Sequence, residues 1–182
     1  MSGKNILIIT GSPRVDGNSD RLADAFIDGA VYAENNVVRF DAGRMNIGGC
    51  KACDTCFTKR AACSVSNGFN TIAAEIEKSD VIVFVTPMYW FSFTSQIKDV
   101  IDKFYSFSRA GKDISGKESI LIVCGGTADK GDFEGIITTY NLILNHLKWE
   151  NLGVLTVPNV NEKGEVKATG ALEKAEEMGK NI

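Results

Sequence analysis

Three short runs of apolar residues, uninterrupted by polar side chains, constrain the fold of this chain more than any other feature. They occupy residues 6–9, 81–85 and 120–124. Such runs form strands of a parallel sheet that is covered on both faces, because neither face of the strand has to meet water. Two more mixed segments, residues 36–40 and 153–157, are typical of strands nearer a sheet edge. The sequence therefore predicts five strands.

Segments with the periodicity of amphipathic helices separate these strands. Apolar residues recur at helical spacing over residues 22–30, 97–104 and 136–147, and a last helix is expected from about residue 169 to 180. Strands that alternate with helices are typical of α/β proteins. We predict an α/β fold with three layers, in which a doubly wound, five-stranded parallel sheet has the order 2-1-3-4-5.

The length of 182 residues, 44% of them hydrophobic, fits one domain that spans residues 1–182. The segment between the second and third strands is too long for an ordinary connection, which has about 2–6 residues. It contains four of the five cysteines of the chain. We predict that residues 42–70 form a cysteine-rich insertion in this domain.

Charge and hydropathy exclude two classes of partner. The formal net charge is −3, and lysines and arginines are scattered among acidic residues, so nucleic acid is not expected to bind. The apolar runs are far shorter than the roughly 20 residues that a membrane span needs. The N-terminus also lacks the layout of a signal peptide, so a cytoplasmic protein is expected.

The segment of residues 10–19 follows the first apolar strand and opens a helix. Its side chains include Ser12, Arg14, Asn18 and Ser19, which can donate hydrogen bonds to phosphate beside the free N–H groups of the helix terminus. Neither the dinucleotide nor the nucleoside-triphosphate glycine motif is present, so the loop favours a single phosphomonoester. The alternative is an ordinary turn in which Asn18 caps the helix.

Three loops should converge where the strand order reverses, because ligands of doubly wound sheets bind at that point. They are residues 11–18, 86–93 and 125–132. The second loop offers an aromatic surface, and the third allows close backbone approach at two glycines. A phosphate joined to a flat ring, as in FMN, matches this set. The alternative is that these aromatic side chains serve core or dimer packing, and both uses are expected.

Several motifs match one known family. They are Gly-Ser-Pro-Arg and Gly-Asn-Ser within residues 11–19, Ser79-Asp80 before the third strand, and Thr-Pro-Met-Tyr-Trp at residues 86–90. Lys98, Asp102 and the segment of residues 164–179 also fit. In these motifs the chain resembles the flavodoxin-like NAD(P)H-dependent FMN reductases, near the branch that includes the iron–sulfur flavoproteins. The resemblance covers nearly the whole chain.

The resemblance implies a flavodoxin-like fold and an FMN site. The phosphate would be held by Ser12, Arg14, Asn18 and Ser19. The isoalloxazine ring would lie against Pro87, Met88, Tyr89, Trp90 and Phe91, with Gly125 and Gly126 along its other edge. Lys98 and Asp102 are interpreted as a surface ion pair without a chemical role.

The expected activity is that of an FMN-dependent NAD(P)H oxidoreductase, with NADPH or NADH as the electron donor and a quinone, flavin or other small molecule, or a redox protein, as the acceptor. Since the cofactor supplies the hydride chemistry, no catalytic side chain is predicted. The single histidine, His146, is interpreted as structural. By analogy with the family, a homodimer or homotetramer is expected.

The four clustered cysteines, Cys50, Cys53, Cys56 and Cys63, are spaced closely enough to converge on one soft site. Three alternatives remain open. The thiols are unliganded or change redox state, they bind zinc, or they hold a [4Fe–4S] cluster as the resemblance to the iron–sulfur flavoproteins implies. The cluster would make the chain an iron–sulfur flavoprotein that acts in electron transfer. The fifth cysteine, Cys124, is expected to be a small core residue.

Overall fold

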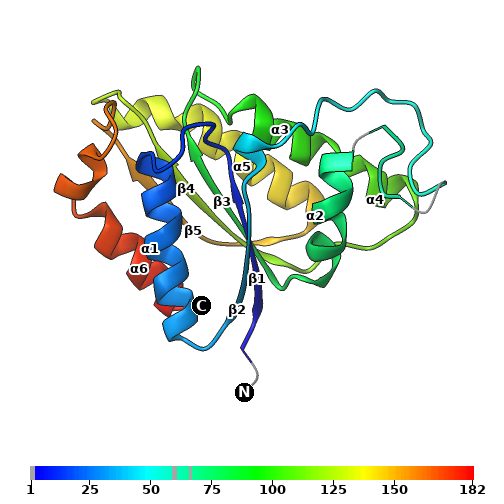
Figure 1. Ribbon diagram of the computed structural model, residues 1–182, viewed down its shortest axis with the longest axis horizontal. Coiled ribbons are helices and arrows are strands. Elements are labelled where there is room, and N and C mark those ends of the chain that lie inside the picture. The colour runs from blue at the N-terminus through cyan, green and yellow to red at the C-terminus, as the bar shows by residue number, and fades with distance from the viewer. Residues whose placement is uncertain (1–2, 59–60, 66) are drawn as a thin grey trace.

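A computed structural model describes residues 3–58, 61–65 and 67–182, and its described residues form one five-stranded parallel sheet (Figure 1). The strands run in the spatial order β2-β1-β3-β4-β5, which confirms the predicted topology. They are β1 (Asn5–Thr10), β2 (Asn36–Phe40), β3 (Val81–Pro87), β4 (Glu118–Cys124) and β5 (Glu150–Val157).

Helices cover both faces of the sheet (Figure 1). One face carries α1 (Asn18–Tyr32) and α6 (Ala171–Lys180), and the other carries α2 (Asn67–Lys78), α3 (Ser95–Asp102), α4 (Tyr105–Arg109) and α5 (Glu134–Leu147). Short 3-10 turns lie at η1 (Ala42–Arg44), η2 (Lys130–Phe133) and η3 (Glu165–Ala168). None of the helices in the described ranges has both the length and the apolar character that crossing a bilayer requires.

Two helix predictions differ from the structure. The helix predicted at residues 97–104 ends early, because α3 stops at Asp102 and the backbone turns at Lys103 and Phe104 before α4 begins. Helix α2 was not predicted, although Phe69, Ile72 and Ile76 recur at helical spacing and are buried. The long cysteine-rich connection before α2 obscured this pattern.

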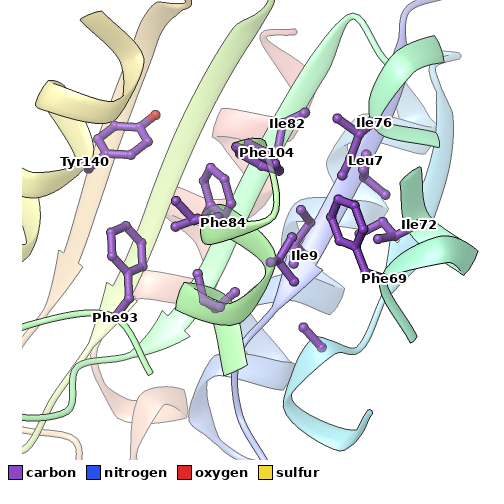
Figure 2. Packing of buried hydrophobic residues seen from close by; sticks show 14 of the residues in the cluster. Leu7, Ile9, Phe69, Ile72, Ile76, Ile82, Phe84, Phe93, Phe104 and Tyr140 are labelled. Atoms are coloured by element: carbon purple, nitrogen blue, oxygen red, sulfur yellow. The ribbon is translucent and has the colours of Figure 1, made fainter. Parts of the chain in front are cut away.

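Side chains of the central strands alternate between two hydrophobic cores. Leu7 and Ile9 of β1 point to the core beneath α2, α3, α4 and α5, which Figure 2 shows together with Phe84 of β3. Ile6 and Ile8 point to the second core, beneath α1 and α6. Because both positions of the alternation are buried, these strands have no polar face, which explains the uninterrupted apolar runs.

Backbone hydrogen bonds align the carboxyl ends of the strands at one edge of the sheet. Pro87 of β3 is in register with Cys124 of β4, which is in register with Val157 of β5. The pairing continues into the loops, since Met88 N donates to Cys124 O at 2.7 Å and Gly125 N donates to Val157 O at 3.0 Å. The loops that leave these strands therefore start side by side.

Candidate functional site

An open cleft lies at this carboxyl edge, with a volume of about 240 Å³. Its walls come from four loops, which follow β1, β3, β4 and β5. Nine of the eleven residues predicted to bind FMN line it: Ser12, Arg14, Asn18, Ser19, Pro87, Met88, Tyr89, Gly125 and Gly126. The structure thus brings together the three loops that were predicted to meet at this edge.

The loop after β1 forms the polar end of the cleft. Ser12 and Ser19 are buried, with 3% and 2% of their surface exposed, whereas Arg14 is exposed. Ser12 Oγ accepts a hydrogen bond from Arg14 N at 3.1 Å, which fixes the turn. Gly17 precedes the first residue of α1, so Asn18 lies within the helix and does not cap it. The cap interpretation of Asn18 was wrong.

Asp20, in the first turn of α1, is buried close to this polar end, where its charge would oppose an anion. Its carboxylate pairs with the guanidinium groups of Arg39 at 2.8 Å and Arg44 at 2.9 Å. Asp41 joins the same group of charges through Arg39 Nε at 2.7 Å. Burial raises the pKa of the Asp41 carboxyl group, but hydrogen bonds from Arg39 and Thr10, together with the charges of Arg39 and Arg44, outweigh it and lower the pKa. The two arginines therefore neutralise the acidic groups beneath the loop.

The loop after β5 was not predicted to contribute, yet Val160, Asn161 and Lys163 line the cleft. Asn18 holds this loop, because its amide donates to Glu162 O and accepts from Gly164 N, both at 2.9 Å. The position of this loop could have been predicted, since all strands of a parallel sheet end at the same edge. What the sequence did not indicate is that Asn18 uses its side chain to fasten one loop to another.

Lys163 adds a second cation to the polar end of the cleft. Its ammonium lies 3.2 Å from a carboxylate oxygen of Asp16. This hydrogen bond, together with the charge of Arg21, lowers the pKa of Asp16 below its ordinary value. Arg14 and Lys163 therefore approach the polar end from two loops that are 149 positions apart in the sequence.

The opposite part of the cleft is less polar. Pro87, Met88 and Tyr89 come from the loop after β3, and Gly125 and Gly126 come from the loop after β4. Cys124 also lines the cleft, although the sequence predicted only a core role. It is 3% exposed, and burial raises the pKa of its thiol to about 12, so the thiol stays protonated and neutral near pH 7.

Trp90 and Phe91, the two remaining predicted residues, do not line the cleft. They form the tip of a two-residue hairpin in which the backbone groups of Tyr89 and Ser92 exchange two hydrogen bonds of 3.1 Å. Both tip residues have a positive φ, of 47° and 63°, which is costly for bulky side chains. Trp90 is 93% exposed. A strained turn thus presents an indole to solvent beside the cleft.

Other polar residues singled out in the sequence lie away from the cleft. His146 is exposed on the last turn of α5 and is absent from the cleft lining. Lys98 and Asp102 form the expected ion pair on the surface of α3, with 2.5 Å between their charged groups. Neither observation gives these residues a chemical role at the cleft.

The four clustered cysteines line a second, smaller pocket between the cysteine-rich loop and the α3–α4 corner. All four thiols are free, with Cys50 and Cys53 exposed, Cys56 half-buried and Cys63 buried. The side chain of Asn70 fixes the end of the loop, because it accepts from Cys63 N at 2.7 Å and donates to Cys63 O at 2.8 Å.

The thiols of this pocket differ in their electrostatic surroundings. A hydrogen bond from Thr55, 3.1 Å from the sulfur, lowers the pKa of Cys53. Burial raises the pKa of Cys56, and the charges of Cys63, Cys53 and Cys50 raise it further. Negative charge on the other three thiols therefore disfavours the thiolate form of Cys56.

The chemistry of this donor set suits a soft metal centre, which thiolates prefer. Among the residues that the structure describes, however, no three cysteine, histidine or acidic side chains stand close enough together to hold a metal ion. The loop has the donors and a shared pocket, but the side chains would have to turn inward to coordinate.

The family model for proteins with a flavodoxin-like fold matches residues 4–182. In sequence, the chain is similar to an iron-sulfur flavoprotein from Archaeoglobus fulgidus, with 27% identity over 119 residues. That alignment covers 64% of this chain and 53% of the relative, so the chain spans about half the length of that protein.

Solved structures with similar folds include an NAD(P)H:quinone oxidoreductase from Methanothermobacter marburgensis, with a TM-score of 0.80 and 17% identity over 98% of this chain and 96% of the other. An FMN-dependent NADH-azoreductase from Bacillus anthracis str. Ames Ancestor, in complex with FMN, has a TM-score of 0.72 and 15% identity, with 98% of each chain covered. At these identities the likeness concerns the fold.

Proposed function

The chain belongs to the family of proteins with a flavodoxin-like fold, and from that premise we propose that it is an FMN-dependent NAD(P)H oxidoreductase. It passes electrons from NADPH or NADH to a quinone, a flavin or another small acceptor. The observation that carries this proposal is the cleft at the carboxyl edge, which joins a cationic, hydroxyl-rich end to a less polar end. The names of the similar oxidoreductases support it.

The residues of the cleft fit the two halves of FMN. Ser12 and Ser19 can donate hydroxyl hydrogen bonds to the phosphate, while Arg14 and Lys163 supply positive charge. The side-chain amide of Asn18 has two N–H groups. One donates to Glu162 O and the amide oxygen accepts from Gly164 N, so the second N–H can donate to the ligand. The N–H groups of the first turn of α1 add to this end of the site.

The isoalloxazine ring would lie between Pro87, Met88 and Tyr89 on one side and the two glycines on the other. The cleft volume of about 240 Å³ is below the roughly 300–1,000 Å³ of typical small-molecule sites. Part of the ring would therefore extend beyond the cleft, toward the hairpin of Trp90 and Phe91. In that position the two aromatic side chains shield the ring and offer a surface for the nicotinamide or the acceptor.

Bound FMN would supply the hydride and electron chemistry, while the protein supplies binding, orientation and electrostatic tuning. None of the described residues lining the cleft is a histidine, and the Cys124 thiol keeps its proton at neutral pH. The side chains therefore hold the cofactor and exclude water from one face of it.

Anaerobic reduction tests this function. The FMN-loaded protein is mixed with NADPH or NADH without oxygen, and the visible flavin absorption is followed. We expect the flavin bands to bleach and to return when a quinone is added. Protein that binds FMN but is not bleached by either nicotinamide would refute the reductase function.

A second candidate function is electron transfer by an iron–sulfur flavoprotein, which the shared pocket of the four thiols favours. In that case Cys50, Cys53, Cys56 and Cys63 would hold a [4Fe–4S] cluster, and a redox protein would be the partner. Iron and sulfide analysis of anaerobically purified protein tests this function. About four irons per chain would support it. Iron-free protein that still reacts with NADPH would refute it and support the reductase function.

We also propose that the protein is a homodimer or homotetramer. The exposed Trp90 and Phe91 beside the cleft support this, because a large apolar surface at a flavin site is better shielded by a second subunit. Analytical ultracentrifugation of the wild type and of a Trp90→Ser variant tests it. A wild-type protein that sediments as a monomer would refute the proposal.

A further inference from the structure

Two buried polar side chains beside the four cysteines are not explained by the fold. Lys103 and Ser106, each 2% exposed, line the thiol pocket from the α3–α4 corner. Ser106 Oγ has no hydrogen-bond partner among the described residues. Lys103 Nζ donates to Gly48 O, but an ammonium group has three donors. Both side chains therefore retain hydrogen-bonding capacity at the wall of the pocket.

Buried polar groups that lack hydrogen-bond partners destabilise the folded protein. A buried hydroxyl without a partner loses its hydration, and a buried ammonium loses more. The other charged residues that line the pocket, Lys51 and Asp54, are exposed, and Asp54 is already bonded to the Tyr105 hydroxyl at 2.7 Å. Among the described residues that line the thiol pocket, Lys103 is thus the one buried cation. An anion bound in the pocket would stabilise its buried charge.

The four thiols provide such an occupant once they bind a metal. Four thiolates carry a charge of −4, and their protons pass to the solvent when they coordinate. Either Zn²⁺ or a [4Fe–4S]²⁺ core leaves a net charge of −2 on the completed centre. Because Cys63 is buried, water screens this charge poorly on the inner side, where Lys103 and Ser106 lie.

We propose that Lys103 and Ser106 are positioning residues of a dianionic metal–tetrathiolate centre at Cys50, Cys53, Cys56 and Cys63. Lys103 offsets its charge, and the Ser106 hydroxyl donates a hydrogen bond to a coordinated sulfur. The proposal concerns the thiol pocket alone and does not depend on the flavin function. It also accounts for the unpartnered hydroxyl, which the ligand-free side chains leave without an acceptor.

The test uses the full chain, reduced and handled without oxygen, in two arms. One arm supplies Zn²⁺ and measures its affinity by competition with a chromophoric chelator. The other supplies Fe²⁺ and sulfide, and measures iron and sulfide content, visible absorption and the rate of cluster loss to a chelator. The variants are Lys103→Gln, which keeps a donor for Gly48 O, and Ser106→Ala. Matched controls are Lys98→Gln and Ser108→Ala, at exposed positions of α3 and α4.

We expect the centre to form in at least one arm, and the arm that succeeds identifies the metal. Lys103→Gln should weaken binding, or speed cluster loss, by about 10–100-fold, as is typical for partners of metal ligands. Ser106→Ala should weaken it by about tenfold. The metal-free Ser106→Ala protein should be at least as thermally stable as the wild type, because its hydroxyl has no partner to lose. The controls should match the wild type.

Three results would overturn the proposal. In the first, the wild type forms neither centre. In the second, both variants hold the metal as tightly as the wild type. In the third, Ser106→Ala destabilises the metal-free and metal-loaded proteins equally, which would make the hydroxyl a packing group. If circular dichroism shows that Lys103→Gln does not fold, the Ser106→Ala result decides.

Discussion

Replacing Arg14 by alanine should weaken the binding of FMN without weakening the binding of riboflavin. Arg14 lies at the polar end of the cleft, where we propose that the phosphate binds, and riboflavin has the same ring without a phosphate. A hydrogen bond to a charged group contributes about 1.5–3 kcal/mol. Since Arg14 is exposed, we take the lower end, which corresponds to about a tenfold increase in the FMN dissociation constant.

The assay is titration of the apoprotein with each flavin, followed by the quenching of flavin fluorescence. An Arg109→Ala variant is the matched control, because Arg109 is also exposed but lies outside the cleft. Equal losses of affinity for FMN and riboflavin would refute the phosphate assignment of Arg14, and so would an unchanged affinity for both. A loss for FMN that disappears in high salt would agree with a charge contact.

Three further predictions concern stability. Gly43→Ala should lower the free energy of unfolding by about 1–3 kcal/mol, because the new Cβ would lie closer than 3.0 Å to the Ser12 backbone; an unchanged denaturant midpoint would contradict this. Trp149→Phe should cost about 1–3 kcal/mol, since the buried indole N–H donates to a backbone carbonyl at 2.5 Å; denaturant titration measures the loss. The pKa of Asp16 lies below 3.8 in the folded protein, so its stabilisation is present above pH 3.8 and is lost as the pH falls through the folded value. Lys163→Gln should reduce this part of the profile of melting temperature against pH, while Arg21 retains its contact with Asp16; an unaltered profile would refute the role of Lys163.

The architecture could be predicted because it depends on short-range patterns. The uninterrupted apolar runs at residues 6–9, 81–85 and 120–124 require burial on both faces, and the helical segments between them supply the cover. The carboxyl ends of parallel strands share one edge, so the loops after β1, β3 and β4 were expected to meet. Ser12, Arg14 and Gly125 accordingly line one cleft.

The tertiary structure decided features that depend on contacts between distant segments. Asn18 fastens the loop after β5 to α1, which brings Lys163 to the polar end of the cleft, and no local pattern encodes that pairing. The positive φ of Trp90 turns its side chain to solvent, although Pro87, Met88 and Tyr89 just before it line the cleft.

The thiol pocket shows the same division. The spacing of the four cysteines is visible in the sequence, as is the chemistry that thiolates offer. That the buried Lys103 and Ser106 line the same pocket follows only from the packing of the α3–α4 corner against the cysteine-rich loop, from which they are 40–56 positions away in the sequence. Sequence patterns report which side chains must be buried, whereas the three-dimensional packing determines which buried groups meet and which are left without a partner.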